Sequence, residues 1–335
     1  MKPSLAQART FPPSAFRLPI LLAALVLLSP AAHAQTDAYP SKPVRLIVGF
    51  TPGSATDVTA RLLAQKLNEA WNVPVTVDNV PGAGGTVGGA RAAKSPPDGY
   101  TLQYGANGAM AIAPGLYTKL GYDPARDFAP ISQILSMGSI VCVHNSLPTR
   151  SMKELIALAK ARPGELSYAS PGAGTPQHVG FELLKILAKV DITHVPYKGA
   201  VFTDVIGGRV PMTMQNAAAI LPTVRDGRLR GLAQTSLQRS PNIPEFPTVA
   251  ESGFPGFEAT SWFGLFAPAG TPPAIVTKLH QDVMKVLAQP DLRSRFAQLG
   301  LDTVGSTPAE LGAIVKTDVA KWTKVIKEAG ISAAD

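Results

Sequence analysis

The sequence predicts an α/β protein made of two domains. Short apolar segments alternate along the chain with segments whose apolar residues recur at helical spacing, which is the order of strand–helix–strand units. At roughly 150 residues a domain, 335 residues suffice for two cores. A stretch rich in proline and glycine, residues 240–256, separates this series from the last part of the chain. We therefore expect two α/β domains with mostly parallel sheets.

The first part of the chain begins with a strand and a helix. The apolar run Val44–Phe50 ends at a Pro-Gly turn and predicts a strand that is buried on both faces. Residues 55–71 place their apolar side chains on roughly one helical face and predict a helix. The alternation continues with a strand at 73–80, a short alanine-rich helix at 88–94 and a strand at 100–104.

A second series follows from residue 140 onward. Ser151 and Glu154 match a capping box and predict where its first helix begins. The predicted strands are 140–144, 166–170, 192–197, 210–214 and 229–234, and the helices between them are 177–190, 202–207 and 217–225. Beyond the segment rich in proline and glycine we expect a strand at 262–267 and helices at 272–288, 291–299 and 308–329.

The N-terminus has the pattern of a secretory signal peptide. Basic residues precede the apolar run 18–28, and Ala32-His33-Ala34 follows it as a small-x-small cleavage site. The run is too short to span a membrane, which takes about 20 residues. We expect cleavage after Ala34 and an exported, soluble mature protein. No cysteine stands at the cleavage site to carry a lipid anchor.

Charge and cysteine content exclude several classes of protein. The formal net charge is +8, and cleavage removes three basic residues and leaves +5. The remaining Lys and Arg are scattered rather than clustered, which argues against nucleic-acid binding. A single cysteine, Cys142, excludes internal disulfides and multi-cysteine metal sites. It lies in an apolar strand, where we expect a buried side chain. No cofactor and no metal site are predicted.

Two loops of similar sequence each follow a predicted strand and open a helix. They are Pro52-Gly53-x-x-Thr56 and Pro171-Gly172-x-x-Thr175, and they belong to different predicted domains. A helix N-terminus carries unpaired N–H groups and a partial positive charge, so two such loops across a cleft would hold a carboxylate. Pro-Gly turns that merely cap helices explain each loop equally well, and Ser54 with Asp57 also fits a capping box. The residues alone leave both interpretations open.

Long segments of the chain resemble the extracytoplasmic solute receptors of tripartite tricarboxylate transporters, the Bug-type or TctC-like binding proteins. The similarity runs from about residue 39 to 331, and its segments are FTPGSATDVTARLLAQKL, VDNVPGAGGTVGGARAAKSPPDGYTL, LSYASPGAGTPQHVGFELLK, DITHVPYKG and FPTVAESGFPGFEATSWFGLFAPAGTP. This resemblance implies a Venus-flytrap fold of the type II periplasmic binding class. With hinge crossings near Met137 and Ala259, domain 1 comprises residues 35–137 plus 259–335, and domain 2 comprises 138–258.

The resemblance also implies the function. Such a receptor is periplasmic and not an enzyme, and it delivers a small organic carboxylate to the membrane permease subunits; we expect a monomer. In the family, the carboxylate is held largely by backbone amides and waters of the two loops. Carried onto this chain, the implied ligand-binding residues are Thr51, Gly53, Ser54, Ala55, Thr56, Asp57, Asn107, Gly108, Ser170, Gly172, Gly174, Thr175, His178, Tyr197 and Asn216.

Two further expectations concern single residues. Gly174 is expected to be small because the ligand or its bridging water lies against the backbone there. The alternative function is an exported α/β hydrolase or transferase that uses a cleft serine such as Ser54, although no G-x-S-x-G elbow accompanies it. The chain also departs from the family pattern at Ser54, where a second glycine is common, which leaves the identity of the ligand open.

Overall fold

The computed structural model describes residues 39–197 and 201–332. From Pro40 onward these residues form one compact unit. The predicted signal peptide, residues 1–34, lies outside the described residues. Among those described, no helix is long and apolar enough to cross a membrane.

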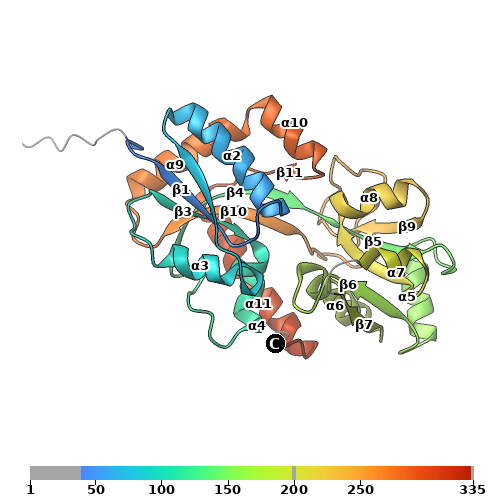
Figure 1. Cartoon of the computed structure of the whole chain (residues 1–335). Coiled ribbons are helices and arrows are strands. Elements are labelled where there is room, and N and C mark those ends of the chain that lie inside the picture. Colours follow the sequence, from blue (N-terminus) through green and yellow to red (C-terminus); the bar gives the residue numbers. More distant parts are fainter. Residues whose placement is uncertain (1–38, 198–200, 333–335) are drawn as a thin grey trace, which may run out of the picture. The chain divides into compact units, whose positions relative to one another are not determined.

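The strands of the described residues form two sheets, each with helices packed against it (Figure 1). The first sheet has the order β11-β4-β10-β3-β1-β2. Its strands are β1 (Val44–Val48), β2 (Val75–Asn79), β3 (Thr101–Ala106), β4 (Phe128–Met137), β10 (Ser261–Pro268) and β11 (Asp302–Thr303). The helical segments of the same part of the chain are α2 (Ala55–Trp71), η1 (Ala83–Gly85), α3 (Thr86–Ala93), η2 (Gly108–Ile112), α4 (Ala113–Leu116), α9 (Pro273–Leu287), α10 (Pro290–Gln298) and α11 (Pro308–Glu328).

The second sheet has the order β7-β6-β8-β5-β9. Its strands are β5 (Ser139–His144), β6 (Ser167–Ser170), β7 (Thr193–Pro196), β8 (Met212–Asn216) and β9 (Leu229–Gln234). The helices around it are α5 (Met152–Ala161), α6 (Pro176–Ala188), α7 (Val201–Ile206) and α8 (Ala217–Arg225). The chain enters this sheet from β4 through the single residue Gly138, and it returns to the first sheet between β9 and β10.

The expectation of mostly parallel sheets is wrong, because both sheets are mixed. β1 pairs in parallel with β2 and β3, and β6 pairs in parallel with β7 and β8. β10 is antiparallel to β3 and β4, and β5 is antiparallel to β8 and β9. β4 and β9, which lead out of their sheets, run in the same direction as the parallel strands, whereas β5 and β10, which enter from the other sheet, run in the opposite direction.

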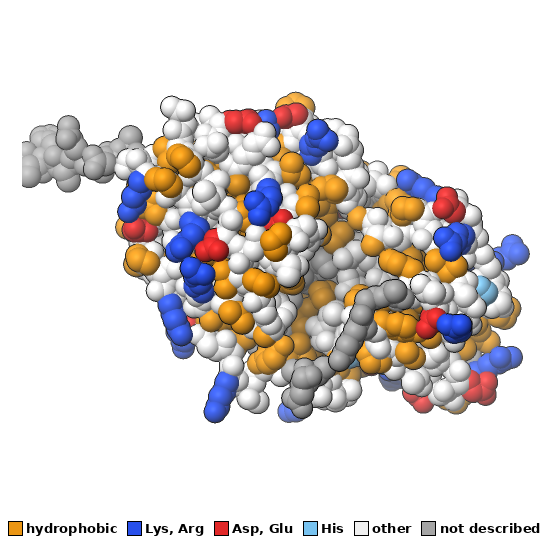
Figure 2. Space-filling model, in the orientation of Figure 1, with side chains coloured by type: hydrophobic (Ala, Val, Ile, Leu, Met, Phe, Trp, Pro, Cys, Tyr) orange, Lys and Arg blue, Asp and Glu red, His pale blue; other side chains and the backbone are white. Residues whose placement is uncertain are grey.

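The expectation of a buried Cys142 is confirmed. Cys142 is fully buried among apolar side chains of the second sheet, and this burial raises the pKa of its thiol. On the face seen in Figure 2, Lys and Arg side chains lie scattered among acidic and apolar ones. This face shows no continuous basic patch that would suit nucleic acid.

Candidate functional site

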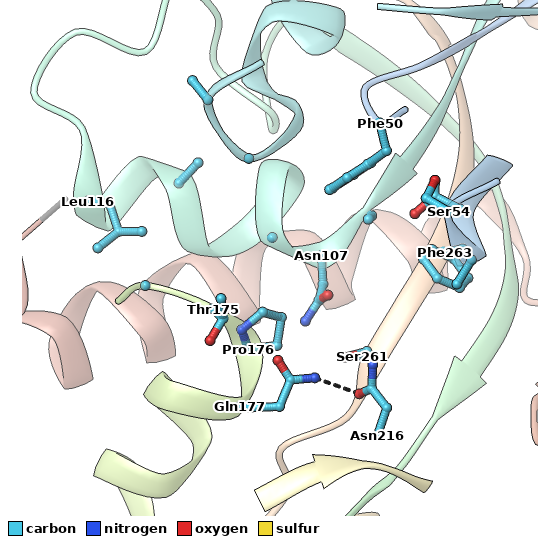
Figure 3. Close-up of a pocket in the computed structure, with 18 of the residues that line it drawn as sticks. Phe50, Ser54, Asn107, Leu116, Thr175, Pro176, Gln177, Asn216, Ser261 and Phe263 are labelled. Atoms are coloured by element: carbon cyan, nitrogen blue, oxygen red, sulfur yellow. Dashed lines mark hydrogen bonds between the residues drawn. The ribbon is translucent and has the colours of Figure 1, made fainter. Parts of the chain in front are cut away.

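A cavity of about 420 Å³ lies between the two sheets (Figure 3). Its size falls within the range of about 300–1,000 Å³ that is usual for small-molecule sites. Residues on the side of the first sheet that line it are Phe50, Ser54, Ala55, Thr56, Ala83, Gly84, Ala106, Asn107, Gly108, Ala113, Leu116, Tyr117, Met137, Ser261 and Phe263. Those on the side of the second sheet are Ala173, Gly174, Thr175, Pro176, Gln177 and Asn216. None of these described lining residues carries a charged side chain.

The cavity brings together part of the predicted site. The predicted residues that line it are Ser54, Ala55, Thr56, Asn107, Gly108, Gly174, Thr175 and Asn216. The predicted residues that do not line it are Thr51, Gly53, Asp57, Ser170, Gly172, His178 and Tyr197. The hydroxyl of Tyr197, for example, donates to Asp204 Oδ2 at 2.8 Å instead.

The sequence interpretation missed the apolar part of the lining. Phe50 directly precedes the predicted Thr51, and both Phe50 and Phe263 lie within the segments that carry the family resemblance. Leu116 and Tyr117 lie at the end of α4, which follows the π-helical turn η2, and no sequence pattern predicted this segment. Gln177 was also missed. Its side-chain amide donates to Asn216 Oδ1 at 2.7 Å, which is the dashed line in the lower part of Figure 3.

The first loop is held by a reciprocal cap at the start of α2. The N-cap Ser54 accepts the Asp57 N–H at 3.2 Å, and Asp57 Oδ2 accepts the Gly53 N–H at 2.9 Å. Arg61 and Asn79 donate to the same carboxylate. Burial acts to raise the pKa of Asp57, but the hydrogen bonds from Arg61, Gly53 and Asn79 outweigh it and hold the pKa below its usual value. Asp57 therefore organises the loop rather than facing the cavity.

The second loop repeats this arrangement with a histidine. The N-cap Thr175 accepts the His178 N–H at 3.4 Å, and His178 Nδ1 accepts the Gly174 N–H at 2.9 Å. Gly53 thus corresponds to Gly174, and Ser54 to Thr175. The motif spacing had paired Gly53 with Gly172 instead, two residues away, because Pro-Gly turns are easier to recognise in a sequence than the helix caps that fix the geometry.

The two helix N-termini differ in the donors that they leave free. In α2, the N–H groups of Ala55 and Thr56 have no hydrogen-bond partner among the described residues. In α6, the corresponding first position is Pro176, which has no N–H, and only Gln177 keeps an unpaired one in the described chain. The positive end of the helix dipole adds to these donors. The α2 side therefore offers the stronger anion site.

Comparisons with known proteins show the family to which the chain belongs. The family model described as "Tripartite tricarboxylate transporter family receptor" matches residues 59–331. The chain belongs to this receptor family. It is 36% identical to Protein BugT of Bordetella pertussis, over 90% of this chain and 93% of that protein.

Two solved structures of similar proteins are also relevant to the receptor. R. palustris Rpa4515 with adipate is 38% identical, with a TM-score of 0.74 over 88% of this chain and 99% of that one. MatC from Rhodopseudomonas palustris with bound malate is 32% identical, with a TM-score of 0.71 over 86% of this chain and 100% of that one. The receptor thus has the two-domain α/β fold of the type II periplasmic binding class.

The structure shows a steric requirement for glycine at position 174 of the receptor that the sequence did not indicate. A Cβ atom at Gly174 would lie 2.6 Å from Leu116 Cδ1, which belongs to the opposite side of the cavity. Its φ of +72° is also one that side-chain-bearing residues rarely adopt. Gly174 and Leu116 therefore meet where the two sides of the cavity come together, and contact with a ligand at Gly174 stays a prediction.

A cluster of stacked rings, of which Tyr168 and His178 are buried and His194 is half-buried, lies next to the second loop of the receptor. His178 stacks on His194 with centroids 3.7 Å apart, and Tyr168 stacks on His194. Ser170 Oγ lies 2.6 Å from His194 Nε2. Burial lowers the pKa of His178 to about 3 and that of His194 to about 4, and the Lys185 ammonium adds to both shifts. Both imidazoles are therefore neutral at pH 7, as an acceptor for the Gly174 N–H requires.

The receptor should lose stability as the pH falls below about 6.5. Because the folded-state pKa values are lowered, the unfolded chain binds protons first, and the free energy of unfolding decreases through that range. Between pH 7 and 5 we expect a loss of about 2 kcal/mol from His178 alone. Urea unfolding at both pH values measures it. His178→Asn keeps an acceptor for the Gly174 N–H and should reduce the pH dependence; an unchanged dependence would contradict this account.

Proposed function

We propose that this chain captures a small organic carboxylate between its two domains and delivers it to the membrane permease of a tripartite tricarboxylate transporter. The observation that carries the proposal is a cavity without charged side chains, into which the N-terminus of α2 opens with unpaired N–H groups. Such a terminus binds anions through its donors and its dipole. The adipate and malate of the two relatives are both carboxylates.

The proposed domains follow the two sheets. Domain 1 comprises residues 35–137 plus 259–335, and domain 2 comprises 138–258, with hinges near Met137 and Ala259. Gly138 between β4 and β5 and the passage from β9 to β10 support these limits. Rotation about the two hinges would open the cavity to admit a ligand and close it for delivery.

The proposed receptor is periplasmic and monomeric, and it is not an enzyme. The hydrolase alternative lacks support, because Ser54 Oγ caps α2 and no histidine is among the described residues that line the cavity. A serine nucleophile needs such a base within hydrogen-bond reach. Turnover of an ester, amide or phosphate that Ser54→Ala abolishes would overturn the non-enzymatic proposal.

Carboxylates should raise the melting temperature of the purified mature protein, whereas their amides should not. A ligand that binds only the folded state adds about 2.7 kcal/mol of stability at a hundredfold excess over Kd, which is a rise of a few degrees for a chain of this length. Amides lack the charge that the helix dipole favours. A thermal melting screen of about a hundred small acids, with matched amides and alcohols as controls, tests this expectation. Equal stabilisation by acids and amides would contradict it.

A further inference from the structure

The cavity has two chemically different ends. At one end lie Ser54, Ala55 and Thr56, at the start of α2. At the other end lie Leu116 and Tyr117, where α4 ends, together with Gly174 and Thr175 before α6. Figure 3 shows Leu116 well apart from the polar side chains of Ser54, Ser261 and Asn216. Phe50 and Phe263 lie on the side of Ser54 in Figure 3, and Thr175 lies on the side of Leu116, so the two ends differ chiefly in the free main-chain donors that the start of α2 supplies.

The donors at the α2 end are sufficient for one carboxylate. The Ala55 and Thr56 N–H groups are unpaired in the described part of the chain. The Thr56 side chain lines the cavity and is only 5% exposed, yet its hydroxyl makes no hydrogen bond to any described residue. The hydroxyl is therefore free to take a hydrogen-bond partner from a molecule in the cavity. A bound carboxylate oxygen would supply it.

The Leu116 end offers fewer donors for a second carboxylate, because the start of α6, which meets Leu116 at Gly174, keeps an unpaired N–H at Gln177 where α2 keeps two. No described lining residue is a lysine, arginine or histidine. In the loop before α6, the Gly174 N–H already donates to His178 Nδ1. The Thr175 hydroxyl is also already hydrogen-bonded, because it donates to Gly172 O at 2.8 Å. An ionised group placed against this surface would lose hydration without gaining a counter-charge.

We propose that the ligand is an amphipathic monocarboxylate, with one carboxylate at the N-terminus of α2 and an uncharged apolar body directed toward Leu116. The inference rests on the proposed function and narrows its substrate class. The cavity of about 420 Å³ leaves room for a body beyond the carboxylate. The proposed ligand differs from the dicarboxylates adipate and malate of the two relatives.

Calorimetric titration of the mature protein with matched probes tests the inference. Hexanoate and adipate share a six-carbon chain and differ in the second carboxylate; benzoate and terephthalate form a second such pair. Each monocarboxylate should bind at least tenfold more tightly than its partner, a difference of about 1.4 kcal/mol. Hexanamide serves as the uncharged control.

The possible failures are distinguishable. Adipate, terephthalate or malate binding as tightly as the monocarboxylates would overturn the inference and leave the carboxylate receptor intact. Hexanamide binding as tightly as hexanoate, or no binding by any of the acids, would overturn the proposed function together with the inference.

A charge introduced at the apolar end provides the complementary test. Leu116→Lys should raise the affinity for adipate relative to hexanoate by at least tenfold, because it supplies the missing counter-charge. Leu187→Lys is the matched control, since Leu187 is 49% exposed and does not line the cavity. An unchanged adipate-to-hexanoate ratio in Leu116→Lys would mean that the ligand body does not lie toward Leu116.

Discussion

Replacing Ala55 by proline should weaken carboxylate binding by about ten- to hundredfold and leave the fold intact. Proline removes one of the two unpaired N–H groups of α2, and a hydrogen bond to a charged group contributes about 1.5–3 kcal/mol. The first position of a helix tolerates proline, and Ser54 before it already has an extended backbone with ψ 159°. The α6 helix begins with Pro176 at the same position. Calorimetric titration with the tightest acid of the melting screen measures the loss.

Two control variants separate the lost donor from the added volume. Ala55→Val keeps the N–H and adds a side chain of similar size to proline, so it should bind more tightly than Ala55→Pro. Pro176→Ala restores an N–H to α6 and should not weaken binding. If Ala55→Val lost as much affinity as Ala55→Pro, the N–H of residue 55 would have no part in holding the carboxylate.

Gly174→Val should weaken binding more than tenfold, which is about 1.4 kcal/mol. The added side chain would overlap Leu116 and hold the two sides of the cavity apart, so that closure around the ligand becomes unfavourable. Titration calorimetry measures the affinity, and thermal melting checks that the variant is folded.

The matched control for this variant is Gly53→Val. Gly53 has a similar φ, +81°, but a Cβ atom there meets nothing within 4 Å, so it carries the backbone strain without the overlap. Leu116→Ala in the Gly174→Val background should recover part of the affinity. Equal losses in Gly53→Val and Gly174→Val, with no recovery, would attribute the effect to strain rather than closure.

The periodic elements could be predicted from the sequence, and the irregular ones could not. The helices 55–71 and 217–225 and the strand 229–234 have the predicted bounds, because their apolar spacing reflects burial directly. β4 was missed, although it lies between β10 and β11. Its segment contains a proline and the buried polar residues Ser132 and Gln133, which hide the apolar pattern of a strand.

The candidate site divides in the same way. Ser54, Ala55 and Thr56 could be predicted because strand-to-helix loops have recognisable turn residues. Leu116 and Tyr117 could not, since their segment, η2 and α4, is a π-helical turn followed by four helical residues. The hydrogen bond from the Gly174 N–H to His178 could not be predicted from the sequence either. The capping-box pattern leads one to expect an acidic residue as the acceptor, and here a histidine takes that place.

The proposed anion site at the start of α2 consists of main-chain N–H groups, and this has a consequence for how ligand choice can change during evolution. The Ala55 and Thr56 N–H groups are present whatever side chains stand there, proline excepted. Substitutions at Leu116, Tyr117 or Phe50 can therefore alter which molecule fits the cavity without removing the hydrogen bonds to its carboxylate. One scaffold could in this way be adapted to different acids by changing a few side chains, while the main-chain donors of the proposed site stay in place.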